Sequence, residues 1–418
     1  MSSNNREWSG GSSGATRRTF IRQSTMATAG LALGSRFAFA APLGRKVRIG
    51  VVGGNFGKGF YFHEHPNAIV EAVSDLRTDR RSALMQTYRC NKSYESLEKM
   101  VGDKNIDAIF IATPAPDHVR HVELVLDSGK HVMSAVPAAW GSLEECERLI
   151  AKVKSTGLKY MMAETSYYYP GTITARQFYR EGKFGNLYSA TAQYHHDGLE
   201  QLYVIDGKRT WRYGMTPMWY PTHCTSMLIS VTGERLTSVS CQGWGDGNAY
   251  LKDNAYQNPF WNETAFFRTD KGTQFTVEVW WKGAHAGDER GEWYGDKMSL
   301  LCGDPNGVGP HPDRIVRAGT QLEKDSGGFV RTEGKVEAFE TPNYWKSDLL
   351  PPGLRHDSDH RGSHTFLTHE FIDSIVKDRN PLIDVYEAVA YTAPGIVAHQ
   401  SAMKGGELLA IPQYDPRR

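Results

Sequence analysis

The sequence predicts an α/β protein with two kinds of sheet. The N-terminal half is expected to form a doubly wound parallel sheet, and the C-terminal half an α+β domain with an open, largely antiparallel sheet. Short β-branched runs alternate with helix-like segments between residues 46 and 163, which is typical of parallel sheets with helices on both faces. From Leu187 onward, strand-like runs rich in β-branched and aromatic residues follow one another across turns. Helical sequence returns at 365–376 and 385–403.

The predicted elements of both halves can be given by residue range. In the first half, strands are expected at 106–112, 131–134 and 158–163, with helices at 117–128 and 143–156 between them. In the second half, the strand candidates are 188–195, 236–244, 263–268, 273–281 and 297–301.

Composition excludes several classes of protein. The 418 residues are 40% hydrophobic and 23% charged, enough for a large core and two or three domains. With 48 Lys+Arg against 47 Asp+Glu, the net charge of +1 gives no electrostatic basis for binding nucleic acid. The five cysteines contain no C-x-x-C pair, so neither a zinc site nor a disulfide framework is indicated. Beyond the first forty residues we find no apolar run of ~18 residues and expect no membrane span.

Residues 1–40 have the pattern of a twin-arginine export signal. Arg17 and Arg18 precede a modest apolar run at 26–34, and Ala38-Phe39-Ala40 offers a cleavage site. The alternative is a chance Arg-Arg pair in a tail. We therefore expect a periplasmic or extracellular protein.

A dinucleotide site is indicated by the first strand–turn–strand unit. The run 46–52 ends in a glycine turn, and a second strand at 69–73 ends at Asp75, 22 residues after Gly53. This spacing matches the fingerprint in which a diphosphate lies on the glycine turn, at a helix N-terminus, and the acid binds the adenosine ribose. The residues assigned to this site are Gly53, Asn55, Phe56, Gly57 and Asp75.

The fingerprint is imperfect, because Asn55 and Lys58 stand where glycines are usual. Asp75 favours NAD, since its charge would repel the 2′-phosphate of NADP. Three nearby arginines leave NADP open as the less favoured cofactor: Arg77, Arg80 and Arg81.

Several motifs together resemble the Gfo/Idh/MocA family of NAD(P)-dependent sugar oxidoreductases. They are 111–114 (Ile-Ala-Thr-Pro), His118, 128–132 (Ser-Gly-Lys-His-Val), 182–185 and 395–406. The resemblance implies a Rossmann domain at 41–165 and a substrate and oligomerisation domain at 166–418, whose last helices can pack back on the first domain. It also implies a carbohydrate substrate and a homodimer or homotetramer formed through the C-terminal sheet. It adds Thr113, Pro114, His118 and Pro137 to the cofactor site.

The family's usual proton-transfer groups are only partly present. Its lysine position is occupied by Val136 and its acid position by Trp219, whereas its histidine is retained as His223. The segments 220–223, 194–197 and 137–139 resemble the glycoside hydrolase family 109 branch, which cleaves glycosides through transient oxidation by bound NAD. That branch usually has Glu before Val-Pro, where this sequence has Ala135.

The candidate catalytic residues are His223, Tyr220, His196 and Tyr168. Histidine titrates near working pH, and tyrosine can act as a base if its pKa is lowered. The alternatives are a hydrogen-bonded core role for His223 and a packing role for Tyr168. We expect an NAD-dependent sugar or glycoside oxidoreductase, with a redox-neutral NAD-dependent glycosidase as the first alternative and a non-catalytic sugar- or cofactor-binding protein as the second.

Three histidines near the C-terminal helices have spacing that could bind a metal. His356, His360 and His364 would share one face of a helix. Gly353 and Gly362 argue against a continuous helix, so a solvated loop or a pocket rim is favoured and no metal site is predicted.

Overall fold

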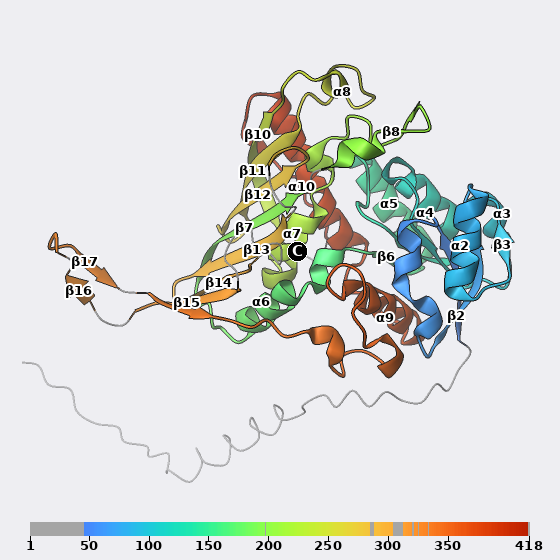
Figure 1. The fold of residues 1–418 in the computed structure, drawn as a ribbon, viewed down its shortest axis with the longest axis horizontal. Coiled ribbons are helices and arrows are strands. Elements are labelled where there is room, and N and C mark those ends of the chain that lie inside the picture. Colours follow the sequence, from blue (N-terminus) through green and yellow to red (C-terminus); the bar gives the residue numbers. More distant parts are fainter. Residues whose placement is uncertain are drawn as a thin grey trace, which may run out of the picture. The chain divides into compact units, whose positions relative to one another are not determined.

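Two sheets organise the protein, as the computed structural model shows (Figure 1). The export signal predicted at 1–40 lies outside the described residues. The structure describes residues 46–196, 198–284, 288–303, 312–319, 322–324, 326–332 and 334–416.

The first sheet has six parallel strands in the order β3-β2-β1-β4-β5-β6. Its central strands are buried on both faces, as expected for β-branched runs that lie between helices. This order confirms the doubly wound parallel sheet. The strands are β1 (Val47–Val52), β2 (Ala68–Ser74), β3 (Ser93–Tyr94), β4 (Ala108–Ile111), β5 (His131–Ser134) and β6 (Tyr160–Met162).

The segment after β1 is not an α-helix. Two 3-10 helices, η1 (Phe56–Phe60) and η2 (Phe62–Glu64), replace an α-helix. Glycines at 57 and 59 disfavour a regular helix, and Tyr61 has a left-handed backbone (φ 52°) that separates the two turns. Phe60 and Phe62 are fully buried, so packing of the aromatic side chains holds this segment.

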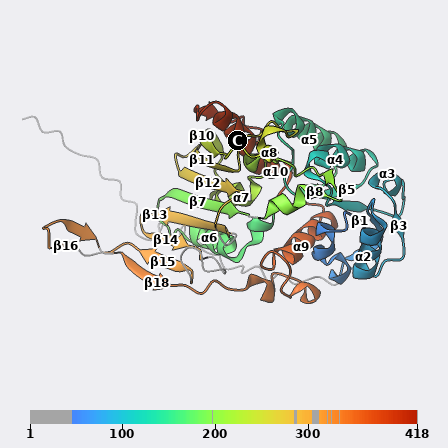
Figure 2. The ribbon, with the colours of Figure 1, turned by 45° about the horizontal axis from the view of Figure 1, so that its top comes forward.

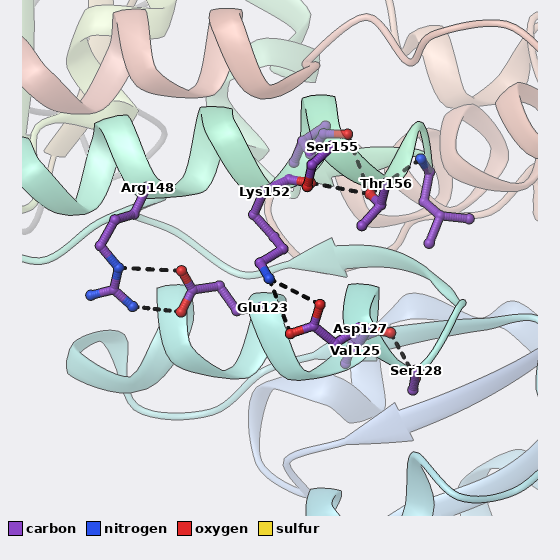
Figure 3. Close-up of polar contacts among 10 residues, drawn as sticks. Glu123, Val125, Asp127, Ser128, Arg148, Lys152, Ser155 and Thr156 are labelled. Carbon is purple, nitrogen blue, oxygen red and sulfur yellow. Dashed lines mark hydrogen bonds and ion pairs between the residues drawn. The ribbon is translucent and has the colours of Figure 1, made fainter.

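Helices α4 (His118–Asp127) and α5 (Leu143–Thr156) pack side by side next to the sheet (Figure 3). Arg148 binds Glu123 through two nitrogens, and Lys152 donates to Asp127 at 2.9 Å. The pairs are largely exposed, so each contributes about 0–1 kcal/mol. The remaining helices of this half are α2 (Thr78–Tyr88), α3 (Leu97–Met100) and η3 (Ala115–Asp117).

The second sheet has nine strands in the order β18-β15-β14-β13-β7-β12-β11-β10-β19. Only the pair β12 and β7 is parallel, which confirms a largely antiparallel sheet. Helices α6 (Pro170–Arg180), α7 (Thr222–Thr232) and α10 (Val385–Met403) lie against one face (Figures 1 and 2). The strands are β7 (Leu187–His195), β10 (Leu236–Trp244), β11 (Asn262–Thr269), β12 (Gln274–Trp280), β13 (Asp288–Gly295), β14 (Met298–Leu301), β15 (Arg314–Arg317), β18 (Lys335–Ala338) and β19 (Leu409–Ala410).

The last helices join the two sheets. Helix α9 (Ser363–Val376) packs against η1 and β1, and α10 packs against α5 and β6. Met162 donates its N–H to the carbonyl of Ile383 at 3.2 Å. Among the described helices, none combines the length and apolar character that a membrane span needs. Short elements complete the described chain: η4 (Thr165–Tyr168), η5 (Leu199–Leu202), β8 (Val204–Ile205), β9 (Lys208–Arg209), η6 (Pro217–Trp219), α8 (Ala249–Lys252), β16 (Leu322–Lys324), β17 (Val330–Thr332), η7 (Tyr344–Lys346) and η8 (Pro352–Leu354).

Candidate active site

The glycine turn after β1 is shaped by close backbone approaches. Gly53 has φ +101°, and a Cβ there would lie 2.3 Å from the carbonyl oxygen of Ala112. A Cβ on Gly54 would lie 2.7 Å from the Cβ and carbonyl oxygen of Arg80. A larger residue at either position would require the loop to move, so this turn fits the close-packed cradle that a dinucleotide needs. Asn55 at the tip of the turn is exposed, and Phe56 is half-buried.

Asp75 completes this cradle from the end of β2. Its carboxylate accepts the N–H groups of Gly54 at 2.6 Å and of Arg77 at 2.8 Å. A carboxylate has about four acceptor positions, so two remain for ribose hydroxyls. Arg77 pairs with Asp79 at 3.0 Å, and Arg81 donates to the Asp75 carbonyl at 2.7 Å. These two arginines already have protein partners, which favours NAD over NADP.

His118 holds two loops together. Its ring nitrogens lie 2.7 Å from the carbonyl oxygen of Pro137 and 2.9 Å from that of Thr113. The ring is 1% exposed, and burial lowers its pKa. These contacts tie the loops after β4 and β5 to the ring of His118, whose assignment to the cofactor site remains a prediction. The hydroxyl of Thr113 is bonded to His121 at 2.8 Å, and Pro114 begins the turn into η3.

His223 lies between two carboxylates. Its Nδ1 is 2.9 Å from Oε1 of Glu164 and 3.4 Å from Oε1 of Glu289. Glu164 follows β6, Glu289 lies on β13, and His223 is in the first turn of α7. The site is thus assembled from both halves of the chain. His223 is 5% exposed and Glu164 is fully buried.

Hydrogen bonds hold both carboxylates in place. The Ser166 N–H donates to Glu164 at 2.9 Å, and the Ser166 hydroxyl donates to Glu289. Tyr169 donates its hydroxyl to the other oxygen of Glu289 at 2.8 Å. Short η4 brings these donors to the edge of the first sheet, because it starts directly after β6.

The two carboxylates keep the imidazole charged. Burial alone lowers the pKa of His223, but the negative charges of Glu164 and Glu289 outweigh it and raise the pKa to about 9. For Glu164, burial alone raises the pKa, and the charge and hydrogen bond of His223 outweigh that effect and lower it. At neutral pH the group is therefore an imidazolium held by carboxylates.

The same three side chains could in principle hold a cation, because their ligand atoms lie within 4.8 Å of one another. However, Oε1 of Glu164 already accepts the Ser166 N–H, and Glu289 accepts the hydroxyls of Ser166 and Tyr169. We interpret the cluster as an acid–base group.

Aromatic and basic side chains lie near the buried imidazole of His223. Tyr220 lies 5.4 Å from the imidazole between ring centroids and stacks on Tyr194 at 6.1 Å. Burial raises the pKa of Tyr220 to about 12, so its phenol is a hydrogen-bond donor rather than a base at neutral pH. The guanidinium of Arg212 lies over Trp211 at 4.1 Å, and its charge acts on Tyr220. The arrangement suits a ligand with hydroxyl groups and an apolar face.

Comparison with known proteins agrees with this geometry. Residues 47–164 match the profile of the oxidoreductase family with an NAD-binding Rossmann fold. This segment is a Gfo/Idh/MocA oxidoreductase domain. The expected NAD-binding domain is thereby confirmed. Over longer stretches the chain is 24% identical to a glycosyl hydrolase family 109 protein of Streptomyces coelicolor (88% of this chain, 83% of the relative) and 25% identical to one of Solibacter usitatus (88% of each). It is 24% identical to an alpha-N-acetylgalactosaminidase of Tannerella forsythia (76% of this chain, 72% of the relative).

Solved structures show the same fold over both domains. Levoglucosan dehydrogenase in complex with NADH and levoglucosan superposes with a TM-score of 0.66 at 15% identity, covering 88% of this chain and all of that one. Scyllo-inositol dehydrogenase from Lactobacillus casei, with bound NAD(H) and scyllo-inositol, has a TM-score of 0.63 at 17% identity, covering 88% and 99%.

Trp219 stands where the sequence resemblance leads one to expect an acid. Its ring packs on Trp140 at 5.6 Å and on Tyr256 at 5.4 Å, and a Cβ on Gly141 would meet it at 2.6 Å. Trp219 is therefore part of an aromatic wall. The negative charges beside His223 are those of Glu164 and Glu289.

For two of the predicted catalytic residues, Tyr168 and His196, the structure describes contacts with residues other than His223. Tyr168 stacks on Phe366 of α9 at 5.1 Å, and burial raises its pKa well above the usual range. These contacts favour the packing alternative for Tyr168, and the neighbouring Tyr169 donates its hydroxyl to Glu289. His196 is exposed at the end of β7 and contacts Tyr194 edge-on at 5.7 Å.

The histidines at 356, 360 and 364 do not share a helix face, because α9 begins at Ser363. His356 binds Glu64 at 2.7 Å, and His364 donates Nδ1–H to the carbonyl of Gly59 at 2.9 Å. The segment lies against η1, next to the nucleotide cradle.

Proposed function

We propose that this chain is an NAD-dependent enzyme that acts on a sugar or glycoside by hydride transfer at a ring carbon. The observation that carries this proposal is the buried triad of His223, Glu164 and Glu289, which stands at the junction of the nucleotide-binding sheet and the second domain. It supplies the proton-transfer group that hydride removal from an alcohol requires. With Val136 at the position of the family's lysine, the retained His223 and its two carboxylates are the proton-transfer group in this proposal.

The residues divide into a cofactor side and a substrate side. Gly53, Gly54 and Asp75 would hold the cofactor, which supplies the hydride acceptor when bound. On the substrate side, Nε2 of His223 has no hydrogen-bond partner among the described residues, whereas Nδ1 is fixed by Glu164. The neutral form of His223, which is the minor form at neutral pH because the pKa is raised to about 9, can accept the hydroxyl proton at Nε2. The two carboxylates stabilise the imidazolium that results, while Tyr220 and Arg212 are placed to donate to neighbouring hydroxyls.

A redox-neutral NAD-dependent glycosidase is the second candidate. The names of the family 109 relatives favour it, and its first step is the same hydride removal. The two candidates differ in what accumulates, which is reduced cofactor for a dehydrogenase and free sugar for a glycosidase.

A glycoside panel tests the proposal. Purified protein is denatured to assay its bound nucleotide, and the native protein is then incubated with p-nitrophenyl glycosides and free sugars, with and without added NAD. We expect bound NAD(H) and either NADH formation or sugar release. A protein that retains NAD without any turnover over a broad panel would instead be the non-catalytic binding protein.

We propose export through the twin-arginine route on the pattern at 1–40. Replacing Arg17 and Arg18 by Lys is expected to leave the precursor in the cytoplasm. Unchanged export of the double variant would contradict this.

We also propose a homodimer or homotetramer formed through the open face of the second sheet. Three large side chains on or near this sheet support it: Tyr188, Trp244 and Phe266 are each more than half exposed. Light scattering of wild type and of Phe266→Glu tests it, and a monomeric wild type would refute it.

A further inference from the structure

A cavity of about 420 Å³ lies in the second domain, and we call it the α6 cavity. It is lined by residues from the N-terminus of α6, from β13 and from the segment 339–361, which leads from β18 to α9 (Figure 1). Ligand pockets usually measure about 300–1,000 Å³, so the α6 cavity can hold a small ligand. Tyr169 and Glu289 belong both to its lining and to the site around His223, whereas the glycine turn and His223 itself do not line it.

Hydrogen-bond donors without a partner lie on the α6 side of this cavity. Thr172 lines the cavity and is 1% exposed, and among the described residues its hydroxyl has no hydrogen-bond partner. No side chain caps α6, so the N–H groups of Gly171 and Thr172 in its first turn also lack an acceptor within the described chain. A buried donor without a partner is costly, and an oxygen of a ligand in the cavity would remove that cost.

A guanidinium group stands beside these donors. Arg361 lies over the ring of Tyr169, the N-cap residue of α6, at 4.9 Å. Arg361 is half-buried and lines the cavity, and it forms no ion pair with any carboxylate in the described part of the chain. Its donors are therefore available to a ligand oxygen.

Acceptors without a partner lie at the edge of the cavity. Glu340 and Asp357 line it with exposed side chains, and neither carboxylate has a hydrogen bond or ion pair with another described residue. Asp313, by contrast, already accepts the N–H of Gly303 at 2.6 Å and the hydroxyl of Thr341. The acceptors that a ligand can reach are thus the two exposed carboxylates.

Aromatic rings add apolar surface to the lining. Trp345 and Phe339 both line the cavity and are half-buried. A Cβ on Gly362 would lie 2.3 Å from Trp345, and Phe178 meets Phe339 edge-on at 5.6 Å, so packing holds both rings in place. Apolar ring faces beside polar groups suit a ligand that has both C–H surface and hydroxyl groups.

The charges of the lining select among ligand classes. Four carboxylates line the cavity but only two arginines, Arg290 and Arg361, so an anion would be repelled. An amine would lie near the charge of Arg361 and would leave the donors of Gly171 and Thr172 without an acceptor. A neutral sugar unit satisfies both sides, because its oxygens accept from the donors and its hydroxyls donate to the exposed carboxylates.

We propose that the α6 cavity is a second binding site, which takes a neutral sugar unit through Thr172, Arg361 and the ring of Trp345. This site goes beyond the proposed hydride transfer and does not depend on it, since the argument rests on the lining of the cavity alone. Two sources can supply such a unit. One is an oligosaccharide substrate that extends from His223 past Glu289, and the other is a separate sugar chain.

Ligand-observed NMR tests the site directly. The protein is purified with its bound nucleotide, and Kd values are measured by saturation transfer for glucose, galactose, maltose, lactose and maltotriose, with glucuronate and glucosamine as charged probes. Thr172→Val removes the hydroxyl at nearly constant volume, and Thr174→Val, in the same helix, is its control because the Thr174 hydroxyl is bonded to the Pro170 carbonyl at 2.9 Å. Arg361→Asn removes the guanidinium, and asparagine tolerates the left-handed backbone there (φ 58°). His360→Asn is its control, because His360 has a similar backbone (φ 56°) and does not line the cavity.

We expect at least one neutral sugar to bind the wild type more tightly than glucuronate and glucosamine do. Its Kd should rise about two- to tenfold in Thr172→Val and about ten- to hundredfold in Arg361→Asn, the losses expected for one neutral and one charge-assisted hydrogen bond. The two controls should bind it as the wild type does. The proposal is overturned if no neutral sugar binds, if a charged probe binds more tightly, or if both cavity variants bind like the wild type.

Kinetics with one-unit and two-unit p-nitrophenyl glycosides distinguish the two sources. If the sugar unit belongs to the substrate, Thr172→Val should raise KM for two-unit glycosides only, with kcat unchanged. If the unit belongs to a separate chain, KM should stay at the wild-type value for both while sugar binding is weakened. A protein that binds neutral sugars in the cavity without any turnover refutes the proposed function and supports the site.

Discussion

The charge on His223 should depend directly on Glu164. Replacing Glu164 by Gln keeps the side-chain shape but removes one of the two negative charges beside Nδ1, 2.9 Å away. Since one pH unit corresponds to about 1.4 kcal/mol, the rise of the His223 pKa from 6.5 to about 9 represents about 3 kcal/mol in favour of the imidazolium. An adjacent opposite charge accounts for roughly one to three pH units. We expect the pKa of His223 to fall by about one to two pH units in Glu164→Gln.

The pH profile of the proposed oxidation provides the assay. Oxidation needs neutral His223, so kcat/KM of the wild type should rise with pH up to about 9. In Glu164→Gln the same rise of kcat/KM should occur at lower pH. Glu263→Gln is a matched control, because Glu263 is also a buried carboxylate paired with a histidine, His399, at 2.8 Å. Glu263→Gln should lower the stability of the fold without changing the pH at which kcat/KM rises. If kcat/KM of Glu164→Gln rises at the same pH as that of the wild type, or if the control shifts equally, this prediction is wrong.

Other substitutions test the remaining roles. His223→Gln should lower turnover by about 10²–10⁴-fold with NAD content unchanged, and a larger loss in Tyr220→Phe would show that the base is misassigned. Gly53→Ala should abolish NAD retention, because its Cβ would lie 2.3 Å from a carbonyl oxygen at φ +101°. Gly102→Ala should retain NAD, because its Cβ would make only an ordinary contact, 3.8 Å from the carbonyl oxygen of Lys99. Asp75→Ala should release NAD on gel filtration, and release of NADP from wild type would contradict the assignment of the ribose contact.

Much of the fold follows from local pattern. The predicted helices at 143–156 and 385–403 coincide with α5 and α10, because strong caps define them: Ser142 and Asp384 cap their N-termini, and Gly157 ends α5 with φ 66°. Strand β13 was missed, since glycine and charged residues interrupt it and its pairing with β7 is a tertiary property. The segment after β1 forms 3-10 helices rather than an α-helix for a local reason, the glycines in 56–60.

The site was predictable only in part. His223 and Asp75 were found because they stand at recognisable motif positions, whereas Glu289 had no signal of its own. Glu164 could have been found, because it follows β6 at the carboxyl edge of a parallel sheet, where ligands of such folds bind. The charge of His223 depends on carboxylates that lie 59 or more positions away in the sequence. No local pattern predicts that these residues meet in the fold.

The most direct test of the account is a rapid-mixing experiment. Holoenzyme is mixed with each glycoside of the panel, and the absorbance of reduced nicotinamide is followed through the first turnover. We expect the absorbance of reduced nicotinamide to rise, transiently or lastingly, with at least one glycoside. In His223→Gln this rise should be lost although NAD remains bound. Glycoside cleavage with no nicotinamide signal, or an undiminished signal in His223→Gln, would contradict it.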